Sequence, residues 1–202
     1  MEYLSHLIIG VLTAYIGLLA PGMLNMTAVQ IAIDKGRKRA YLFSTGASVV
    51  ILFQAGIALV FTSYLHGNPQ IIRRLETIAV FVFFALAIAF FVKTRLKFTY
   101  RKRRRHKGRY FLWGVGMSLM NMLAIPFYLG VSTYLGAKGF LLMGEEYTIL
   151  FVVGIVLGAF LLFFSYISLS KIVKKKVSFI AKNINYLLSI LFLLLGIVAW
   201  FH

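Results

Sequence analysis

The sequence predicts an all-α integral membrane protein with six transmembrane helices, arranged as a 3+3 inverted-topology repeat in which helices one and four are broken near the midplane. Three observations predict this fold: long apolar segments, basic residues confined to one side, and a polar motif that recurs beside a proline in each half. The 202-residue chain is 61% hydrophobic and 13% charged, unlike a soluble domain. We treat residues 1–202 as a single transmembrane domain, with half-repeats 1–92 and 111–202 around a basic cytoplasmic loop, 93–110.

Apolar segments of membrane-spanning length fill most of the chain. A hydrocarbon core of about 30 Å is crossed by about 20 apolar residues in a helix. The segments that meet this length are Tyr3–Ile33, Ala40–Leu65, Leu75–Val92, Phe111–Leu135, Tyr147–Leu169 and Ile184–Phe201. The first is too long for one straight span. Pro21-Gly22 divides it into a helix and a shorter half-helix, because proline removes a backbone hydrogen bond and clashes with the preceding turn.

The basic residues predict the orientation of these spans. The loops after spans one, three and five contain all but three of the 22 Lys and Arg residues, the exceptions being Arg73, Arg74 and Lys138. By the positive-inside rule these loops are cytoplasmic and both termini face outward. Anionic lipid is their expected partner. We therefore interpret the run 101–109 as a topological anchor and predict no nucleic-acid partner. With three spans in each half, any relation between the halves must be an inverted-topology repeat.

The recurring motif is Asn25-Met26-Thr27-Ala28 in span one and Asn121-Met122-Leu123-Ala124 in span four. The first copy follows Pro21-Gly22, and the second precedes Pro126. A polar amide beside a helix breaker is costly in hydrocarbon, and broken helices at matching places build the binding site of repeat transporters. Two interpretations stay open. The freed N–H groups and Asn side chains bind a polar ligand, or the proline only kinks a helix whose loose groups are satisfied by neighbouring helices.

Span two adds an amide, Gln54, deep in apolar sequence, where it needs a partner or a cavity. A ligand contact and a structural hydrogen bond are equally compatible with it. The candidate substrate-binding residues are Pro21, Gly22, Asn25, Gln54, Asn121 and Pro126. Other small residues predict packing faces: Gly10, Ala14 and Gly17 on span one, the cluster 44–48 on span two, and Gly154 with Gly158 on span five.

The sequence lacks the residues that a metal site or an enzyme active site within the membrane would require. The chain has no cysteine, its five acids lie at or outside span boundaries, and its four histidines lie near loops or ends. Metal ligands and an active-site constellation at membrane depth are therefore missing. We predict no cofactor, no metal site and no enzymatic activity. The N-terminus has neither a basic n-region nor a cleavage pattern before Pro21, so we expect the first apolar segment to be a span that stays.

These features resemble the LysE/RhtB family of bacterial amino-acid exporters. The residues similar to the family's Pro-Gly-Pro…Gly-Arg…Gly pattern are Ala20-Pro21-Gly22, Gly36-Arg37 and Gly46, and those similar to the segment opening its second half are Gly114, Asn121 and Pro126. Met23 differs from the third motif residue, and Ala124-Ile125 stands where an Asn would precede the proline. The span count and the long basic central loop agree as well, so the resemblance covers the whole length.

The resemblance implies a secondary-active transporter in the bacterial plasma (inner) membrane that exports amino acids or related small metabolites from the cytoplasm, with the proton as the expected coupling ion. A zwitterion suits the sequence, because its carboxylate matches half-helix N-termini and its ammonium matches exposed carbonyls. The alternatives are an ion or metal exporter of the same superfamily and a non-transporting membrane assembly or lipid-modifying protein. The missing intramembrane acids count against the first, and the paired broken spans against the second. The substrate and any homo-oligomer stay open.

Overall fold

The computed structural model divides into two compact units. It describes residues 2–19, 22–68, 109–121, 123–142 and 144–173, with shorter pieces at 81, 84–85, 87–88, 91–92, 186, 189–190, 193–194, 197 and 200. Unit 1 comprises Met1–His66 and Arg105–Lys174, and unit 2 comprises Gly67–Arg104 and Lys175–His202. Each unit draws on both halves of the chain. The elements of the described residues are helices, and no strand occurs among them, as an all-α protein requires.

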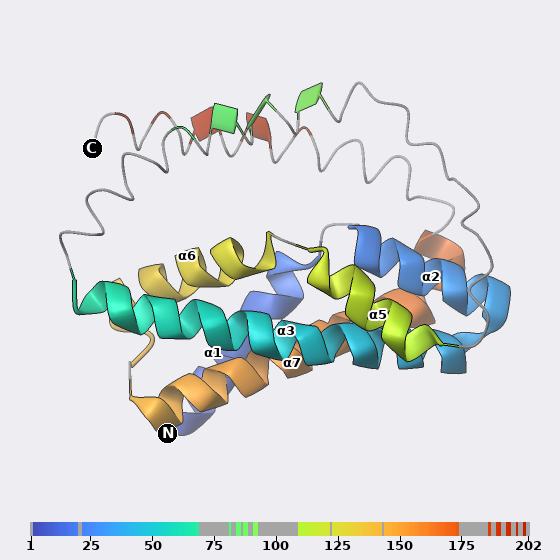
Figure 1. Ribbon diagram of the computed structural model, residues 1–202, viewed down its shortest axis with the longest axis horizontal. Coiled ribbons are helices and arrows are strands. Elements are labelled where there is room, and N and C mark those ends of the chain that lie inside the picture. The colour runs from blue at the N-terminus through green and yellow to red at the C-terminus, as the bar shows by residue number, and fades with distance from the viewer. Residues whose placement is uncertain are drawn as a thin grey trace. The chain divides into compact units, whose positions relative to one another are not determined.

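Unit 1 contains predicted spans one, two, four and five. Its described helices are α1 (Glu2–Gly17), α2 (Met23–Lys35), α3 (Arg37–His66), α5 (Tyr110–Leu119), α6 (Ala124–Ala137) and α7 (Glu145–Ser168) (Figure 1). Helices α3 and α7 are each long and apolar enough to cross a membrane, and α5 with α6 meets that criterion as a bent pair. Helix α1 is a shorter apolar helix. Unit 1 is therefore built as a membrane helical bundle.

Unit 2 contains predicted spans three and six. Most of both spans lies outside the described residues, as does the basic loop from 93 to 108. The residues that are described between 81 and 92 and between 186 and 200 are helical. The Ser189 hydroxyl donates to the Ala87 carbonyl oxygen at 3.0 Å. Segments from the two halves of the chain are therefore in contact within this unit.

Spans one and four are each broken, as the sequence predicts. Helix α1 ends at Gly17 and α2 begins at Met23; we call residues 18–22 break one. Helix α5 ends at Leu119 and α6 begins at Ala124; we call residues 120–123 break two. The axes of α5 and α6 differ by 64°. Within the breaks, residues 20, 21 and 122 lie outside the described part of the chain.

Helix α1 packs along α7 through glycines. A Cβ added to Gly154 would collide with the Leu7 carbonyl, and one added to Gly158 with the Val11 carbonyl. A Cβ on Gly10 would likewise collide with the backbone of α7. Residue numbers increase together along both helices, so the two run parallel. The predicted packing role of these glycines is confirmed, and it follows from the close backbone approach that small residues permit.

Helix α5 packs along α3 in a similar manner. A Cβ on Gly46 would collide with the Phe111 carbonyl. Further along, the Thr62 and Ser132 hydroxyl oxygens lie 2.6 Å apart and join α3 to α6. Residue numbers again increase together, so α3 runs in the same general direction as both parts of span four, whose axes differ by 64°. One unbroken helix therefore supports both halves of one broken helix.

Helices α3 and α7 run antiparallel to each other. Near the start of α3, Arg37 donates to the Ser168 carbonyl at the end of α7, with 3.4 Å between nitrogen and oxygen. The rings of Tyr41 and Phe164 stack nearby, with centroids 5.9 Å apart. These contacts gather the start of α3 and the end of α7 at one end of unit 1.

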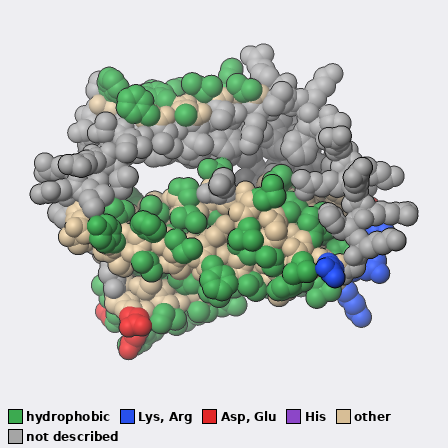
Figure 2. All heavy atoms as spheres, viewed as in Figure 1, with side chains coloured by type: hydrophobic (Ala, Val, Ile, Leu, Met, Phe, Trp, Pro, Cys, Tyr) green, Lys and Arg blue, Asp and Glu red, His purple; other side chains and the backbone are tan. Residues whose placement is uncertain are grey.

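Charged side chains separate toward the two ends of unit 1. The acidic residues Glu2, Glu145 and Glu146 lie in the first turns of α1 and α7. The basic residues at the opposite end of the helices are Lys35, Arg37, Lys38, Arg39, Arg109 and Lys171, with the acid Asp34 among them, while Lys138 at the end of α6 lies at the acidic end. On the face shown in Figure 2 the acidic side chains gather at the lower left and the basic ones at the right. This is the charge pattern of helices that cross a membrane with one basic side.

Candidate functional site

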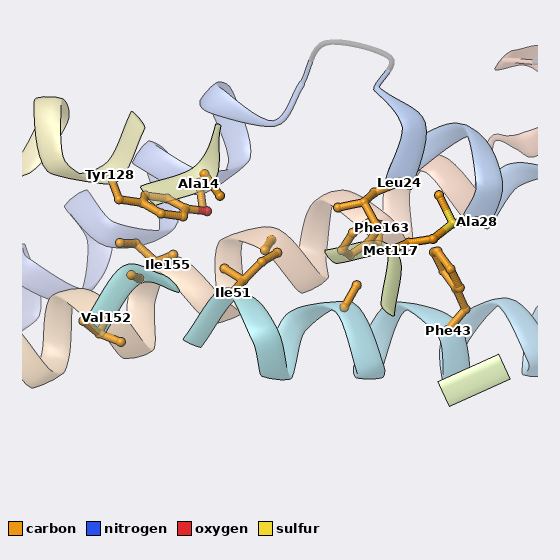
Figure 3. Close-up of a cluster of buried hydrophobic side chains, with 14 of the residues drawn as sticks. Ala14, Leu24, Ala28, Phe43, Ile51, Met117, Tyr128, Val152, Ile155 and Phe163 are labelled. Carbon is orange, nitrogen blue, oxygen red and sulfur yellow. The ribbon is translucent and has the colours of Figure 1, made fainter. Parts of the chain in front are cut away.

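The half-helices that flank the two breaks share one buried cluster of unit 1, whereas Leu19, Met120 and Leu123 within the breaks are exposed. Leu24 in the first turn of α2, Met117 near the end of α5 and Phe163 of α7 belong to one buried cluster (Figure 3). A Cβ on Gly17, the last residue of α1, would collide with the ring of Phe127 in the first turn of α6. The ends of all four half-helices therefore meet in one region. We treat this region as the candidate site.

Break one is held by two side chains that donate to its carbonyls. The last carbonyls of a helix have no partner within that helix. The Asn25 side-chain nitrogen donates to the Leu18 carbonyl oxygen at 2.7 Å, and Asn25 is buried with 4% of its surface exposed. The Tyr166 hydroxyl of α7 donates to the Leu19 carbonyl oxygen at 2.6 Å and also interacts with the Asn25 side chain. Asn25 and Tyr166 together hold the chain beyond the end of α1.

The N-terminus of α2 follows break one. Gly22 is its N-cap, with extended backbone angles φ −90° and ψ 178°, and supplies no side-chain cap. The first hydrogen bond of the helix runs from the Met26 N–H to the Gly22 carbonyl at 3.0 Å. The N–H groups of the preceding residues point along the helix axis at its positive end. Such a terminus attracts a carboxylate or another anion.

Break two is held by Gln54 of α3. The Gln54 side-chain nitrogen donates to the carbonyl oxygens of Ser118 at 3.1 Å and of Asn121 at 3.4 Å. Each of these carbonyls also accepts a backbone N–H, from Asn121 and Ala124 respectively. The amino group of Gln54 is therefore a structural donor. Among the residues that the structure describes, neither its buried oxygen Oε1 nor the Ser118 hydroxyl has a hydrogen-bond partner.

The two breaks are held at matching positions of α3 and α7. Gln54 follows Gly46 by eight residues, and Tyr166 follows Gly158 by eight residues. In each pair the glycine touches the backbone of the broken span, and the later residue donates to a carbonyl where that span's first helix ends. One geometric relation thus occurs twice in unit 1.

The predicted site residues differ in their position relative to the two breaks and in whether their side chains are buried there. Gln54 and Asn121 are in contact, but Asn121 contributes its backbone carbonyl and its side chain is half-buried. Asn25 is the third residue of α2, whereas Asn121 lies within break two. The two Asn-Met pairs therefore differ in their position relative to the breaks. Pro126 is exposed at the third position of α6, and Pro21 lies outside the described residues.

Two residues at the breaks were not predicted. Ser118 and Tyr166 are polar residues within apolar spans, but for Ser118 this signal is shared with other small residues of the helices, such as Ser44 and Ser132. Tyr166 carried a second signal, because its spacing from Gly158 repeats the spacing of Gln54 from Gly46. Ser118 lies three residues before Asn121, so its hydroxyl is nearly one helical turn from the residue that the sequence singled out.

Comparison with known proteins identifies the family. The family model described as LysE type translocator matches residues 15–201, which include both breaks and the helices that hold them. No curated protein and no solved structure matches the chain significantly. The family resemblance of the sequence is thereby confirmed. The chain belongs to the LysE type translocator family, whose members are membrane transporters rather than enzymes.

Proposed function

We propose that the protein is a secondary-active transporter that exports amino acids or related small metabolites from the cytoplasm across the bacterial inner membrane. The observation that carries the proposal is the pair of adjacent helix breaks, each held by a side chain of a neighbouring unbroken helix. Broken helices whose ends meet in the bundle core are the usual way to present backbone polar groups to a substrate inside a membrane. The family membership supports the same function.

The packing of unit 1 supports a six-span, 3+3 inverted-topology repeat. Helix α1 of span one lies on α7 of span five, and α5 of span four lies on α3 of span two. If spans one, two and three correspond to spans four, five and six, the pair of spans one and five corresponds to the pair of spans four and two. Both pairs are parallel, whereas α3 and α7 are antiparallel, as the alternation of six spans requires. Unit 2 contains the remaining pair of predicted spans, three and six.

The charge separation supports the orientation with both termini outside. The basic end of unit 1 contains the start of α3 and the residue before α5, which lie in predicted cytoplasmic loops. The acidic end contains the first turns of α1 and α7. A reporter that is active only in the cytoplasm should be silent after His202 and active when inserted near Lys102. Activity after His202 would contradict the inverted repeat.

An amino acid fits the site because it carries opposite charges on a small frame. The N-terminus of α2 at Gly22 is suited to the carboxylate. The carbonyl and amide oxygens at break two are suited to the ammonium. The proposed driving force is the proton gradient, which the cell maintains across the membrane that contains the carrier. The breaks are the places where substrate and protein would exchange hydrogen bonds.

Counterflow of labelled amino acids into proteoliposomes tests the proposal. Vesicles with the purified protein are loaded with one unlabelled amino acid and diluted into the same labelled compound, across a panel of the common amino acids. We expect at least one to accumulate transiently above the level in protein-free vesicles. The matched control is Pro21→Ala with Asn25→Ala, which should abolish the signal while the protein still inserts. Counterflow for no member of the panel would contradict amino-acid export.

A further inference from the structure

The Ser118 hydroxyl is unlike most helix hydroxyls of unit 1. A Ser or Thr side chain in a helix commonly donates to a carbonyl one turn earlier, which satisfies it without an outside partner. The hydroxyls that do so here include those of Thr27, Ser44, Thr45, Thr62 and Ser165. Ser118 is fully buried, yet its oxygen has no hydrogen-bond partner within the described part of the chain. A buried polar group of this kind needs a ligand or a water to offset its desolvation.

Gln54 presents a second unpartnered oxygen at the same break. Its amino group is committed to the carbonyls of Ser118 and Asn121, which fixes the orientation of the amide. Its oxygen Oε1 is buried and has no hydrogen-bond partner among the described residues. Since one hydrogen bond joins Gln54 directly to Ser118, the two unpartnered oxygens belong to neighbouring residues. Both are acceptors, although the hydroxyl can also donate.

The surroundings of these oxygens favour a positive ligand. They lie at the C-terminal end of α5, which carries the negative end of the helix dipole. On the other side of the break two backbone donors are removed, because the Ala124 N–H is already bonded to the Asn121 carbonyl and Pro126 has no N–H. The oxygens are neutral, so they match one positive charge better than two.

We propose that Gln54 Oε1 and Ser118 Oγ form a binding site for a compact, singly charged cationic group at break two. Unwound backbone beside the C-terminal end of a half-helix is where membrane carriers commonly bind such groups. The group is either the ammonium of the exported substrate or an alkali cation, since both are recognised by neutral oxygens. The ammonium source rests on the proposed function, whereas the alkali source does not.

Thermal unfolding of the purified protein in detergent tests the site with Ser118→Ala. This variant removes only the unpartnered hydroxyl and leaves the contacts of Gln54 intact. One arm replaces sodium chloride by choline chloride at constant ionic strength. The other compares a mixture of the common amino acids with the same mixture N-acetylated, which removes the ammonium charge. We expect one probe pair to shift the midpoint, and Ser118→Ala to require about ten- to a hundredfold more of the stabilising probe.

The matched control is Ser48→Ala. Ser48 is also buried on α3 with an unpartnered hydroxyl, but it precedes Gln54 by six residues, or about 9 Å along the helix. Its variant should respond to both probes as the natural protein does. Gln54→Met provides a second variant, which should weaken the response at least as much as Ser118→Ala.

Two results would overturn the site. If neither probe pair shifts the midpoint of thermal unfolding and Ser118→Ala only raises that midpoint, the hydroxyl is unsatisfied or binds water only. If Ser118→Ala and Ser48→Ala respond alike, the ligand binds elsewhere. Counterflow measured on the same preparations separates this proposal from the transport function. If sodium raises the midpoint of the natural protein but not of Ser118→Ala, and no counterflow is seen, the site is supported and the transport function is not. If counterflow is seen and Ser118→Ala responds to both probes as the natural protein does, the transport function is supported and the site is not.

Discussion

Break one and break two share an architecture but differ in the polar groups they leave unpartnered. Each lies between two half-helices and is held by a residue eight positions after a glycine on the supporting helix. At break one the side chains of Asn25 and Tyr166 take the carbonyls of Leu18 and Leu19. At break two the amide oxygen of Gln54 and the hydroxyl of Ser118 have no hydrogen-bond partner in the part of the chain that the structure describes. One repeated scaffold thus carries two chemically different ends.

The half-helices that follow the breaks strengthen this difference. Helix α2 begins with a glycine N-cap and three residues that all have N–H groups. Helix α6 has Pro126 as its third residue, and its first N–H is bonded to the Asn121 carbonyl. Break one is therefore richer in donors and break two in acceptors. A zwitterion would be bound in one orientation by such a pair.

The largest expected effect concerns the shared scaffold. Gly46→Ala and Gly158→Ala each place a Cβ against the backbone of the broken span, so each should lower the free energy of unfolding by about 1–3 kcal/mol. Gly56→Ala on α3 is the control, because a Cβ there meets no atom of unit 1. Thermal unfolding in detergent measures all three. A large loss of stability in only one of Gly46→Ala and Gly158→Ala would contradict the structural equivalence of α3 and α7.

The next effect separates the residues that hold the breaks. Gln54→Leu removes two buried hydrogen bonds and should lower the free energy of unfolding by about 2 kcal/mol. Tyr166→Phe removes the bond to the Leu19 carbonyl, which lies in a more exposed place, and should cost about 1 kcal/mol or less. Chemical or thermal unfolding of the two purified variants provides the comparison. The opposite order would mean that break one depends on its supporting helix more than break two.

The smallest effect distinguishes the two asparagines. The Asn25 side chain is buried and bonded to the Leu18 carbonyl, so Asn25→Ala should destabilise the protein by about 1 kcal/mol. Asn121 holds its position through its backbone, so Asn121→Ala should leave stability nearly unchanged. The sequence alone predicts similar roles for both. If unfolding experiments show the same loss of stability for both variants, the two asparagines have equivalent structural roles, and the difference in their positions relative to the breaks has no effect on stability.

The two breaks, the long helices α3 and α7 and the bent pair of α5 with α6 could be predicted from the sequence because each depends on local chemistry. Apolar length defines α3 and α7, and a proline in apolar sequence predicts an interruption, whereas glycines such as Gly46 and Gly158 lie inside unbroken helices. The equivalence of Asn25 and Asn121 could not be judged in this way. A four-residue likeness does not say where a break begins, and Asn25 lies inside a helix while Asn121 lies between two. The proline precedes α2 in one half but belongs to α6 in the other.

The partners of the polar residues required the three-dimensional structure. Gln54 is separated from Ser118 by 64 residues, and Tyr166 from Leu19 by 147. The sequence indicated Gln54 because an amide is rare in an apolar span. It could not show that the amide nitrogen makes structural hydrogen bonds while the amide oxygen has no partner among the described residues. Ser118 resembles any small residue at a packing face. Its distinction is the absence of a bond to its own helix, which no sequence pattern reports.

Thiol accessibility tests most directly whether the two breaks form one transport site. The chain has no cysteine, so single substitutions Gly22→Cys and Leu123→Cys report on break one and break two without competition. Val60→Cys, at an exposed position of α3, is the control. Proteoliposomes are treated with a membrane-impermeant thiol reagent from one side, with and without the amino acid that shows counterflow. We predict that the amino acid slows labelling at both breaks and not at Val60→Cys. Labelling of both breaks at rates that the amino acid leaves unchanged would contradict the account.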